Sequence, residues 1–263
     1  MVSVISKFLL PFFHYKYLML QLTQRAIKER YKQSIIGYAW VLLNPLLQLL
    51  IYAFVFSVVF RFPLDNVPYP LFLFVGLLPW IYLQNTLTVA ALSLVDNSDL
   101  LRKVNFPRET LPYSVIFAKA VDFIFASLLF LTFIFYYQQP LYLTALWIFP
   151  LFIIQIILMT GLSLLVSCFN LFYRDIQHLT NLILLMWMYL TPIVYPLSMV
   201  PKNWVYVYKL NPLVGIIEGY RSAIFNTAFD TGAILWSFVF SFIILIAGYL
   251  IFKKTEKVFA DIV

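Results

Sequence analysis

FIFASLLFLTFIFYYQQPLYLTALWIFPLFIIQIILMTGLSLLVSCFNLFY, residues 123–173, contains no Asp, Glu, Lys or Arg over 51 positions. A helix that crosses a membrane needs about 20 consecutive apolar residues. The stretch is therefore long enough for two crossings. Gln138, Gln139 and Pro140 lie about a third of the way along it, where they predict the turn between the two spans.

Tracts of the same kind flank this stretch at 33–60, 66–95, 176–201 and 231–252. Hydrophobic residues make up 63% of the chain and charged residues 11%, against about 45–50% and about 25% in soluble domains. The sequence thus predicts an all-α polytopic membrane protein forming one transmembrane domain over 1–263. We expect six spans, at 35–60, 70–94, 113–136, 145–171, 177–196 and 232–252.

Positive charge divides unequally between the two sides of the membrane in this topology. Four Lys/Arg residues fall on one side of the membrane and thirteen fall on the other side. Cytoplasmic loops carry the excess of Lys and Arg, so we expect both termini in the cytoplasm. The net charge of +7 restates this bias, and no basic aromatic pattern indicates a nucleic-acid partner. Thirteen Lys/Arg residues fall on the other side: Lys7, Lys16, Arg25, Lys28, Arg30, Lys32, Arg102, Lys103, Arg108, Arg174, Lys253, Lys254 and Lys257.

The segment before the first span, 1–34, is basic and amphipathic. Over 16–33, polar residues recur at helical spacing opposite an apolar face, which predicts a helix lying along the cytoplasmic interface. A positively charged anchor that only fixes topology is the compatible alternative. No small-residue cleavage site follows a short apolar region, so we expect the segment to be retained.

A charged island, DNSDLLRKVNFPRETLP at 96–112, separates the second and third spans. Asn97 or Ser98 can cap a short helix that has Asp99 in its first turn. Arg102 and Lys103 lie near its end, and Phe106-Pro107 stops it. The pattern favours a helix that docks on a partner over an ordinary solvated loop.

The region 197–230 is expected outside the fifth span, yet it is apolar. Asn211 followed by Pro212 predicts a helix start, because Asn caps and Pro suits the first helical position. Glu218 and Arg221 are three apart and can pair. This helix is apolar but too short to cross the membrane, which predicts an element that re-enters the membrane from outside. A small cap on the outer surface is the alternative, and 231–263 completes the chain as span six and a tail.

The sequence lacks the residue patterns on which several kinds of enzyme and binding site depend. The sequence contains no G-x-x-x-x-G-K-[ST] loop for ATP, no G-x-S-x-G and no H-E-x-x-H. Cys168 is the only cysteine, and His14 and His178 lie far apart, so we expect no disulfide, metal site or cofactor. Lys119 and Asp122, near the start of the third span, favour a structural ion pair over a functional site.

Five runs follow one another along the chain: RYKQSIIGYAWVLLNPLLQLLIY (30–52), LRKVNFPRETLP (101–112), FYRDIQHL (172–179), YLTPIVYP (189–196) and NPLVGIIEGYRSAIF (211–225). In their order and spacing they resemble the membrane subunits of ABC exporters of polysaccharides, and within these the O-antigen permease group. The resemblance covers nearly the whole chain.

The resemblance implies a non-enzymatic half-transporter in the inner membrane that forms a homodimer. Two separate subunits would bind ATP and magnesium on the cytoplasmic side. Residues 96–108 would form the coupling helix that docks on the ATPase, with Asp96, Asp99, Arg102, Lys103, Phe106 and Arg108 as its contacts. Outer gate helices would include Asn211, Pro212, Glu218 and Arg221.

The resemblance also implies a substrate, a polysaccharide carried on polyprenyl pyrophosphate. Arg25, Arg30 and Lys32 would attract the pyrophosphate by charge-assisted hydrogen bonds, although each also suits a topology anchor. Sugar rings stack on aromatic side chains, which equally serve interfacial belts and cores. The expected pore aromatics are Tyr38, Trp40, Tyr52, Trp187, Tyr189 and Tyr195.

Alternative functions follow from the same features. An exporter of the same superfamily could carry capsule, teichoic acid or a small amphipathic molecule. A polyprenyl-dependent transferase would need paired carboxylates or a His base near the interface, and the sequence offers no such cluster. A scaffold would not require the island at 96–112.

Overall fold

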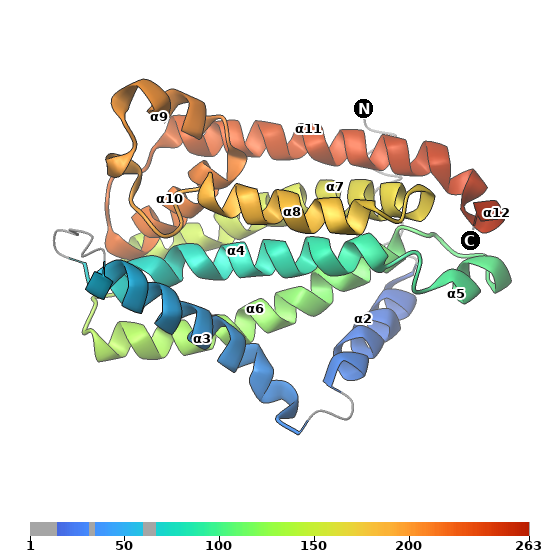
Figure 1. Cartoon of the computed structure of the whole chain (residues 1–263), viewed down its shortest axis with the longest axis horizontal. Coiled ribbons are helices and arrows are strands. Elements are labelled where there is room, and N and C mark those ends of the chain that lie inside the picture. The colour runs from blue at the N-terminus through green and yellow to red at the C-terminus, as the bar shows by residue number, and fades with distance from the viewer. Residues whose placement is uncertain (1–14, 32–34, 60–66, 263) are drawn as a thin grey trace.

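The computed structural model describes residues 15–31, 35–59 and 67–262. Within these ranges the chain is helical and contains no strand. Long helices run side by side along the longest axis of the molecule, as Figure 1 shows. The expected all-α class is therefore confirmed for the described part of the chain.

Five helical segments are long and apolar enough to cross a membrane in the described ranges. They match the first, second, third, fourth and sixth expected spans. The first joins η1 (Gly37–Ala39), α3 (Trp40–Ala53) and the π-helical η2 (Phe54–Val59). The others are α4 (Tyr69–Leu92), α6 (Thr110–Tyr136), η3 (Leu143–Trp147) with α7 (Ile148–Phe172), and α11 (Thr231–Thr255) with η5 (Glu256–Val258).

The helix expected over 177–196 ends early. It is α8 (Ile176–Tyr189), whose 14 residues are about 21 Å long, while the hydrocarbon core of a bilayer is about 30 Å thick. The prediction of a continuous helix to residue 196 is therefore wrong. Pro192 gives the reason, because proline lacks an N–H and disfavours helical backbone in the residue before it.

Helix α4 is the centre of the packing. It contacts α3, α6, α7, α8 and α10, and most of its side chains are buried. The most extensive helix contact is between α7 and α11, which meet at glycines. A Cβ atom on Gly248 would lie within 2.4 Å of the Gly161 carbonyl oxygen, so the two backbones touch. Small residues commonly allow such close approach between membrane helices.

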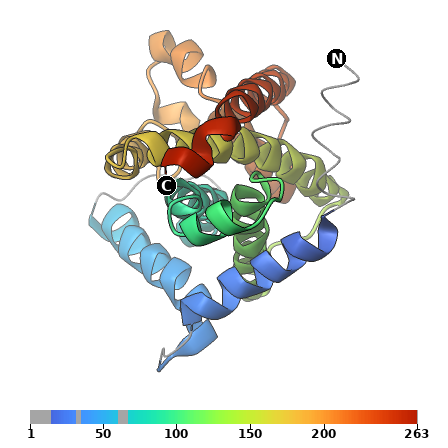
Figure 2. The same cartoon turned by 90° about the vertical axis from the view of Figure 1, so that its right-hand side faces the viewer.

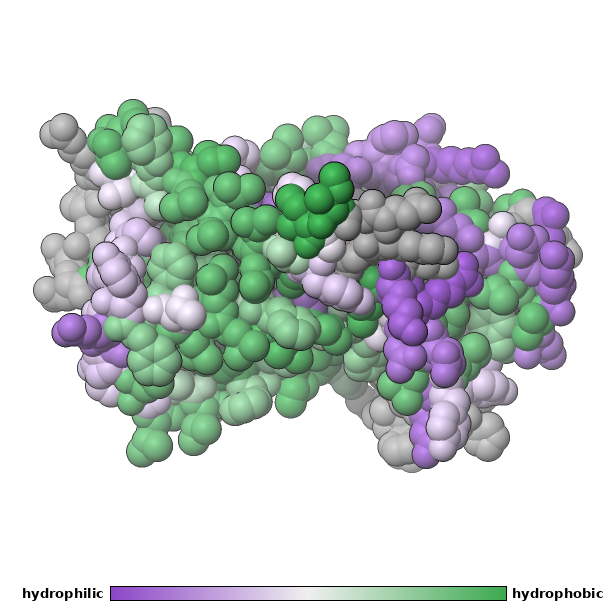
Figure 3. Space-filling view, turned by 90° about the horizontal axis from the view of Figure 1, so that it is seen from below, coloured by the Kyte–Doolittle hydropathy of each residue, from purple (hydrophilic) through white to green (hydrophobic). Residues whose placement is uncertain are grey.

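The short elements lie at the two ends of the bundle. At one end are α2 (Lys16–Tyr31), α5 (Ser98–Lys103) and α12 (Phe259–Ile262), with α12 packed against α5 (Figures 1 and 2). Hydrophilic side chains gather at this end, and apolar side chains cover most of the rest of the face seen in Figure 3. At the opposite end are η4 (Leu197–Met199), α9 (Lys202–Lys209) and α10 (Pro212–Phe225).

Asp230 fastens the loop before α11, and its removal should lower stability. Its side chain accepts a hydrogen bond from the Ala233 N–H at 3.0 Å and pairs with Lys209 at 2.6 Å. We expect Asp230→Ala to cost about 1–2 kcal/mol, chiefly through the lost helix cap. Asp230→Asn is the matched control because asparagine caps equally well, so it should lose only the part-exposed ion pair, worth less than about 1 kcal/mol.

The hydrogen bond to Lys209 lowers the pKa of Asp230 below its usual value. A carboxylate with a lowered pKa stabilises the folded state at neutral pH, and this stabilisation is lost as the pH falls through the folded-state pKa. Thermal unfolding in detergent at neutral and acidic pH measures both effects. Equal unfolding temperatures for the wild type and Asp230→Ala at neutral pH would contradict the assignment.

Candidate functional site

The charged island forms the expected short helix. In α5 the backbone N–H groups of Leu100 and Leu101 donate to the Asn97 carbonyl at 3.0 and 3.1 Å. Asn97 is the N-cap residue, but its side chain donates to the Ser93 carbonyl at 2.8 Å and makes no capping bond. The helix and its order of acid before base are confirmed, whereas the side-chain cap predicted for Asn97 or Ser98 is absent from this helix.

The charged side chains of α5 face solvent. Asp96, Asp99, Arg102 and Lys103 are exposed, and Asp99 pairs with Lys103 at 3.4 Å while their side chains stay 87% and 75% exposed. Leu101 is buried and fixes the helix on the bundle. Leu100 also packs against the hydrophobic core, so the structure presents a charged face beyond the ends of the long helices that is held by apolar contacts on its inner side.

The other two expected coupling residues face inward. Phe106 packs on the hydrophobic core. The backbone N–H of Arg108 donates to Glu256 Oε1 at 3.3 Å, and its guanidinium donates to the Glu256 carbonyl and lies 6.0 Å from the centre of the Phe259 ring. Arg108 thus contacts the C-terminal segment of its own chain.

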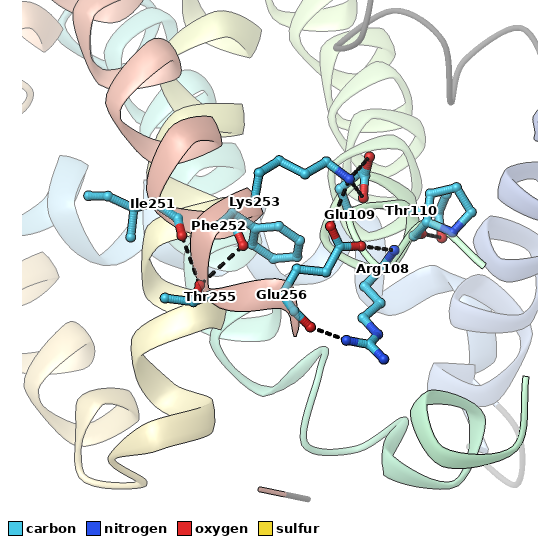
Figure 4. Close-up of polar contacts among 9 residues, drawn as sticks. Arg108, Glu109, Thr110, Ile251, Phe252, Lys253, Thr255 and Glu256 are labelled. Atoms are coloured by element: carbon cyan, nitrogen blue, oxygen red, sulfur yellow. Dashed lines mark hydrogen bonds and ion pairs between the residues drawn. The ribbon is translucent and has the colours of Figure 1, made fainter. Parts of the chain in front are cut away.

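An ion pair between the buried Glu109 and the part-exposed Lys253, beside Arg108, was not foreseen from the sequence. Glu109, 1% exposed, accepts from Lys253 Nζ at 2.8 Å, and Lys253 also pairs with Glu256 at 2.8 Å (Figure 4). Burial raises the pKa of Glu109, and the hydrogen bond with Lys253 opposes that rise. Helical spacing indicates the pairing of Lys253 with Glu256. No sequence spacing predicts the contact between Lys253 and Glu109, because the two residues are 144 positions apart.

At the opposite end, α10 begins as expected. Asn211 Oδ1 accepts from the Leu213 N–H at 3.1 Å, and Pro212 occupies the first helical position. The Asn211 side chain also accepts from Trp187 Nε1 at 3.0 Å and donates to Thr191 Oγ1 at 2.9 Å. Asn211 therefore caps α10 and ties it to the end of α8.

Arg221 on α10 holds the non-helical segment that follows α8. Its guanidinium donates to the carbonyls of Pro192 and Ile193 at 2.6 and 2.7 Å, while the side chain is 3% exposed. It also pairs with Glu218 at 2.6 Å, as expected, and lies 3.7 Å from the centre of the Phe72 ring. Buried backbone carbonyls outside a helix need such internal partners.

The expected pore aromatics differ in their exposure. Tyr38, Trp40 and Tyr189 are exposed. The other three are half-buried and make internal contacts, with Trp187 on Asn211, Tyr52 hydroxyl 3.8 Å from Met188 Sδ, and Tyr195 hydroxyl 2.8 Å from the Tyr189 carbonyl oxygen.

Two grooves meet at Lys119. One, of about 450 Å³, lies between α3, α4 and α6 and is lined by Trp40, Lys119 and Asp122, among others. The second, of about 380 Å³, is lined by Arg25 of α2, Asp96 and Lys119. Lys119 and Asp122 pair at 3.8 Å, as the sequence predicts. Of the cations expected to attract pyrophosphate, Arg25 lines a groove, while the Arg30 side chain and Lys32 lie outside the described residues.

Metal-binding side chains do not cluster in the described part of the chain, where no group of three or more His, Cys, Asp or Glu could hold an ion. Cys168 is a buried free thiol 3.0 Å from Thr255 Oγ1. The ring of His178 contacts the Gln177 amide at 3.2 Å, and His14 lies outside the described residues.

Comparison with known proteins gives one consistent family. Residues 17–225 match the family described as ABC-2 type transporter. The chain is 33% identical to the O-antigen export system permease protein RfbA of Klebsiella pneumoniae, over 93% of this chain and 94% of that protein. It is 33% identical to RfbA of Myxococcus xanthus, with 95% and 96% covered. The polysialic acid transport protein KpsM of Escherichia coli is 23% identical, with 89% and 91% covered.

Proposed function

The chain belongs to the ABC-2 type transporter family, and on that basis we propose that it is the permease subunit of an exporter of lipid-linked polysaccharide of the O-antigen type. The observation that carries this proposal is the 33% identity to O-antigen export permeases over at least 93% of the chain. Export would run from the cytoplasmic to the outer side of the inner membrane. The chain itself would be a non-enzymatic permease, and ATP with magnesium would bind to a separate subunit.

We infer an assembly of two copies of this chain with two ATP-binding subunits. The multi-pass chain would place both termini and α5 in the cytoplasm, which is supported by the excess of Lys and Arg in those segments of the sequence and by the hydrophilic side chains that gather at that end in Figure 3. Helix α8 together with residues 190–196 would form the fifth of the six crossings in chain order. Helices α9 and α10 would re-enter from outside as a gate, a role supported by the burial of α10 among α4, α7 and α11.

Helix α5 would dock on the ATP-binding subunit and pass its movement to the spans. The exposed charges Asp96, Asp99, Arg102 and Lys103 support a polar docking contact. Rigid packed contacts switch between discrete arrangements, so a docked helix can transmit movement without absorbing it.

The substrate would enter near α2. Arg25 at the groove shared with Lys119 supports attraction of a pyrophosphate head group there, with Arg30 and Lys32 on the same segment. The exposed rings of Tyr38, Trp40 and Tyr189 suit weak stacking with sugars, and many weak contacts let a polymer keep moving. Tyr52, Trp187 and Tyr195 would support this lining from behind.

A capsule exporter is the second candidate function. The similarity to KpsM, named as a polysialic acid transport protein, favours it, but at 23% identity. Teichoic acid or a small amphipathic molecule would use the same architecture. The two polysaccharide candidates differ in the sugar chain, so transport assays with each class separate them.

The decisive test reconstitutes the complex in lipid vesicles. The chain is co-expressed with the ATP-binding protein of the same transporter, purified as a complex, and assayed for ATP hydrolysis and for uptake of polyprenyl-pyrophosphate-linked glycan. We expect a stable complex and several-fold stimulation of hydrolysis by the O-antigen glycolipid. Stimulation and uptake only with an acidic capsular chain would favour the second candidate, and neither with any glycolipid would refute both.

A further inference from the structure

We propose that Glu109 and Lys253 form the link that carries the movement of α5 into α11 and through it to the outer helices. This inference rests on the proposed function. It makes both residues positioning residues for transport, because they act through the helices that they join and do not touch the substrate. Neither residue belongs to the exposed face on which the ATP-binding subunit would dock.

The link begins at the end of the coupling segment, the residues 96–108 that contain α5. Glu109 directly follows Arg108 and stands at the start of α6, while Lys253 and Glu256 stand at the end of α11. Lys253 Nζ lies 2.8 Å from oxygens of both carboxylates. Displacing α6 against α11 would separate the buried Glu109 carboxylate from the Lys253 ammonium, and leaving a buried charge without its partner is costly. The two helix ends should therefore move together.

Arg108 and Phe259 reinforce the joint. The Arg108 backbone and guanidinium both donate to Glu256, and the guanidinium lies over the Phe259 ring. That ring is fully buried and packs edge-on against Phe252 at 5.2 Å and against Phe172 at 6.2 Å. Because α12 also packs against α5, the C-terminal segment connects the coupling helix to the last span in two places.

Helix α11 reaches the outer helices from this joint. Its 25 residues are about 37 Å long. At its far end Ser237 Oγ donates to the Pro212 carbonyl at 2.7 Å, and Trp236 Nε1 donates to the Leu210 carbonyl at 2.9 Å. A Cβ on Gly215 would meet the Ala233 carbonyl oxygen at 2.3 Å, so α10 and α11 are in backbone contact. One rigid helix thus contacts the coupling segment at one end and α10 at the other.

The test removes both charges at once. Glu109→Gln with Lys253→Met leaves no buried unpaired charge from this pair, and replacement of a buried ion pair by neutral groups is often tolerated. The Glu256 carboxylate keeps its hydrogen bond from the Arg108 backbone N–H and is part-exposed. We expect the double variant to assemble with the ATP-binding subunit and to hydrolyse ATP within about twofold of wild type, while glycan exported per ATP falls at least fivefold.

Two further variants make the outcome specific. Lys254→Met removes a neighbouring exposed charge and should export normally. The exchanged pair Glu109→Lys with Lys253→Glu restores an ion pair and should recover at least half of the export per ATP. Wild-type export per ATP in the double neutral variant would overturn the inference. So would failure of that variant to assemble while the exchanged pair assembles, because the pair would then serve folding alone.

The same vesicles separate this inference from the proposed function. If wild type and Lys254→Met export no glycolipid although the complex hydrolyses ATP, the proposed function fails. In that case distances measured between spin labels at Asn105 and Tyr206, both exposed, still test the link. ATP should change this distance in wild type and leave it unchanged in the double neutral variant. An equal change in both would contradict the link without reference to cargo.

Discussion

Replacing Arg221 with methionine is expected to destabilise the protein by about 3–5 kcal/mol and to abolish export. Methionine retains much of the volume, but the carbonyls of Pro192 and Ile193 lose their guanidinium donors in a buried segment. Each unsatisfied buried group costs about 1–3 kcal/mol. Glu218 loses its cation as well. The segment that joins α8 to the outer helices should then lose its single arrangement.

Glu218→Gln is the matched control for Arg221→Met. Glu218 is part-exposed, and its replacement leaves Arg221 bound to both carbonyls and to the Phe72 ring. We expect a loss of less than about 1 kcal/mol and near-normal export. Thermal unfolding in detergent and vesicle export measure both variants. If Arg221→Met unfolds at the wild-type temperature, the two carbonyls do not depend on Arg221, and the role assigned to it is incorrect.

Arg221→Lys adds a geometric comparison. The two carbonyl oxygens lie on different nitrogens of the guanidinium, Nη1 and Nη2. A lysine ammonium is a compact charge without that planar fork. The site leaves little room for rearrangement, since even a Cβ on Gly76 would lie 2.9 Å from Nη2. We therefore expect lysine to recover part of the lost stability and little of the export.

The membrane-length helices were predictable because their signal is additive over many residues. A charge-free tract of 20 or more positions predicts a span whatever its partners are, and five such helices are present in the described chain. The end of α8 was within reach too, since Pro192 breaks a helix locally. The expected length of that span was wrong because hydropathy continues to residue 196 while the backbone does not stay helical.

Contacts between residues that lie far apart in the sequence could not be predicted from its pattern. The cap at Asn211 and the pair of Glu218 with Arg221 depend on spacings of two and three residues, and both are present. The carbonyls that Arg221 binds lie 28 and 29 positions away, and no periodicity points to them. For Lys253, similarly, the sequence spacing indicates only the pair with Glu256, three residues away. Arg108 was grouped with the exposed charges of α5 because the pattern records charge without direction.

Reversing the charge of Arg102 is expected to lower glycan export at least tenfold while the chain still folds and inserts. Arg102 is exposed on α5, so its replacement by glutamate disturbs no buried contact. The helix loses one cation near its C-terminus, which costs a few tenths of a kcal/mol to about 1 kcal/mol. Any larger loss of activity must come from a contact with another molecule, and steering by complementary charge makes docking sensitive to sign.

Asp99→Lys should act in the same direction, and Lys254→Glu supplies the control. Lys254 is an exposed cation at the same end of the molecule but on α11, so its reversal changes the net charge equally without altering α5. Co-purification with the ATP-binding subunit, ATP hydrolysis and export are measured together. Weaker binding or hydrolysis without export in Arg102→Glu and Asp99→Lys, with normal values in Lys254→Glu, places docking on α5. Normal export in both α5 variants would move the docking surface elsewhere on that end, because a contact that tolerates either sign of charge at two exposed positions one turn apart cannot include them.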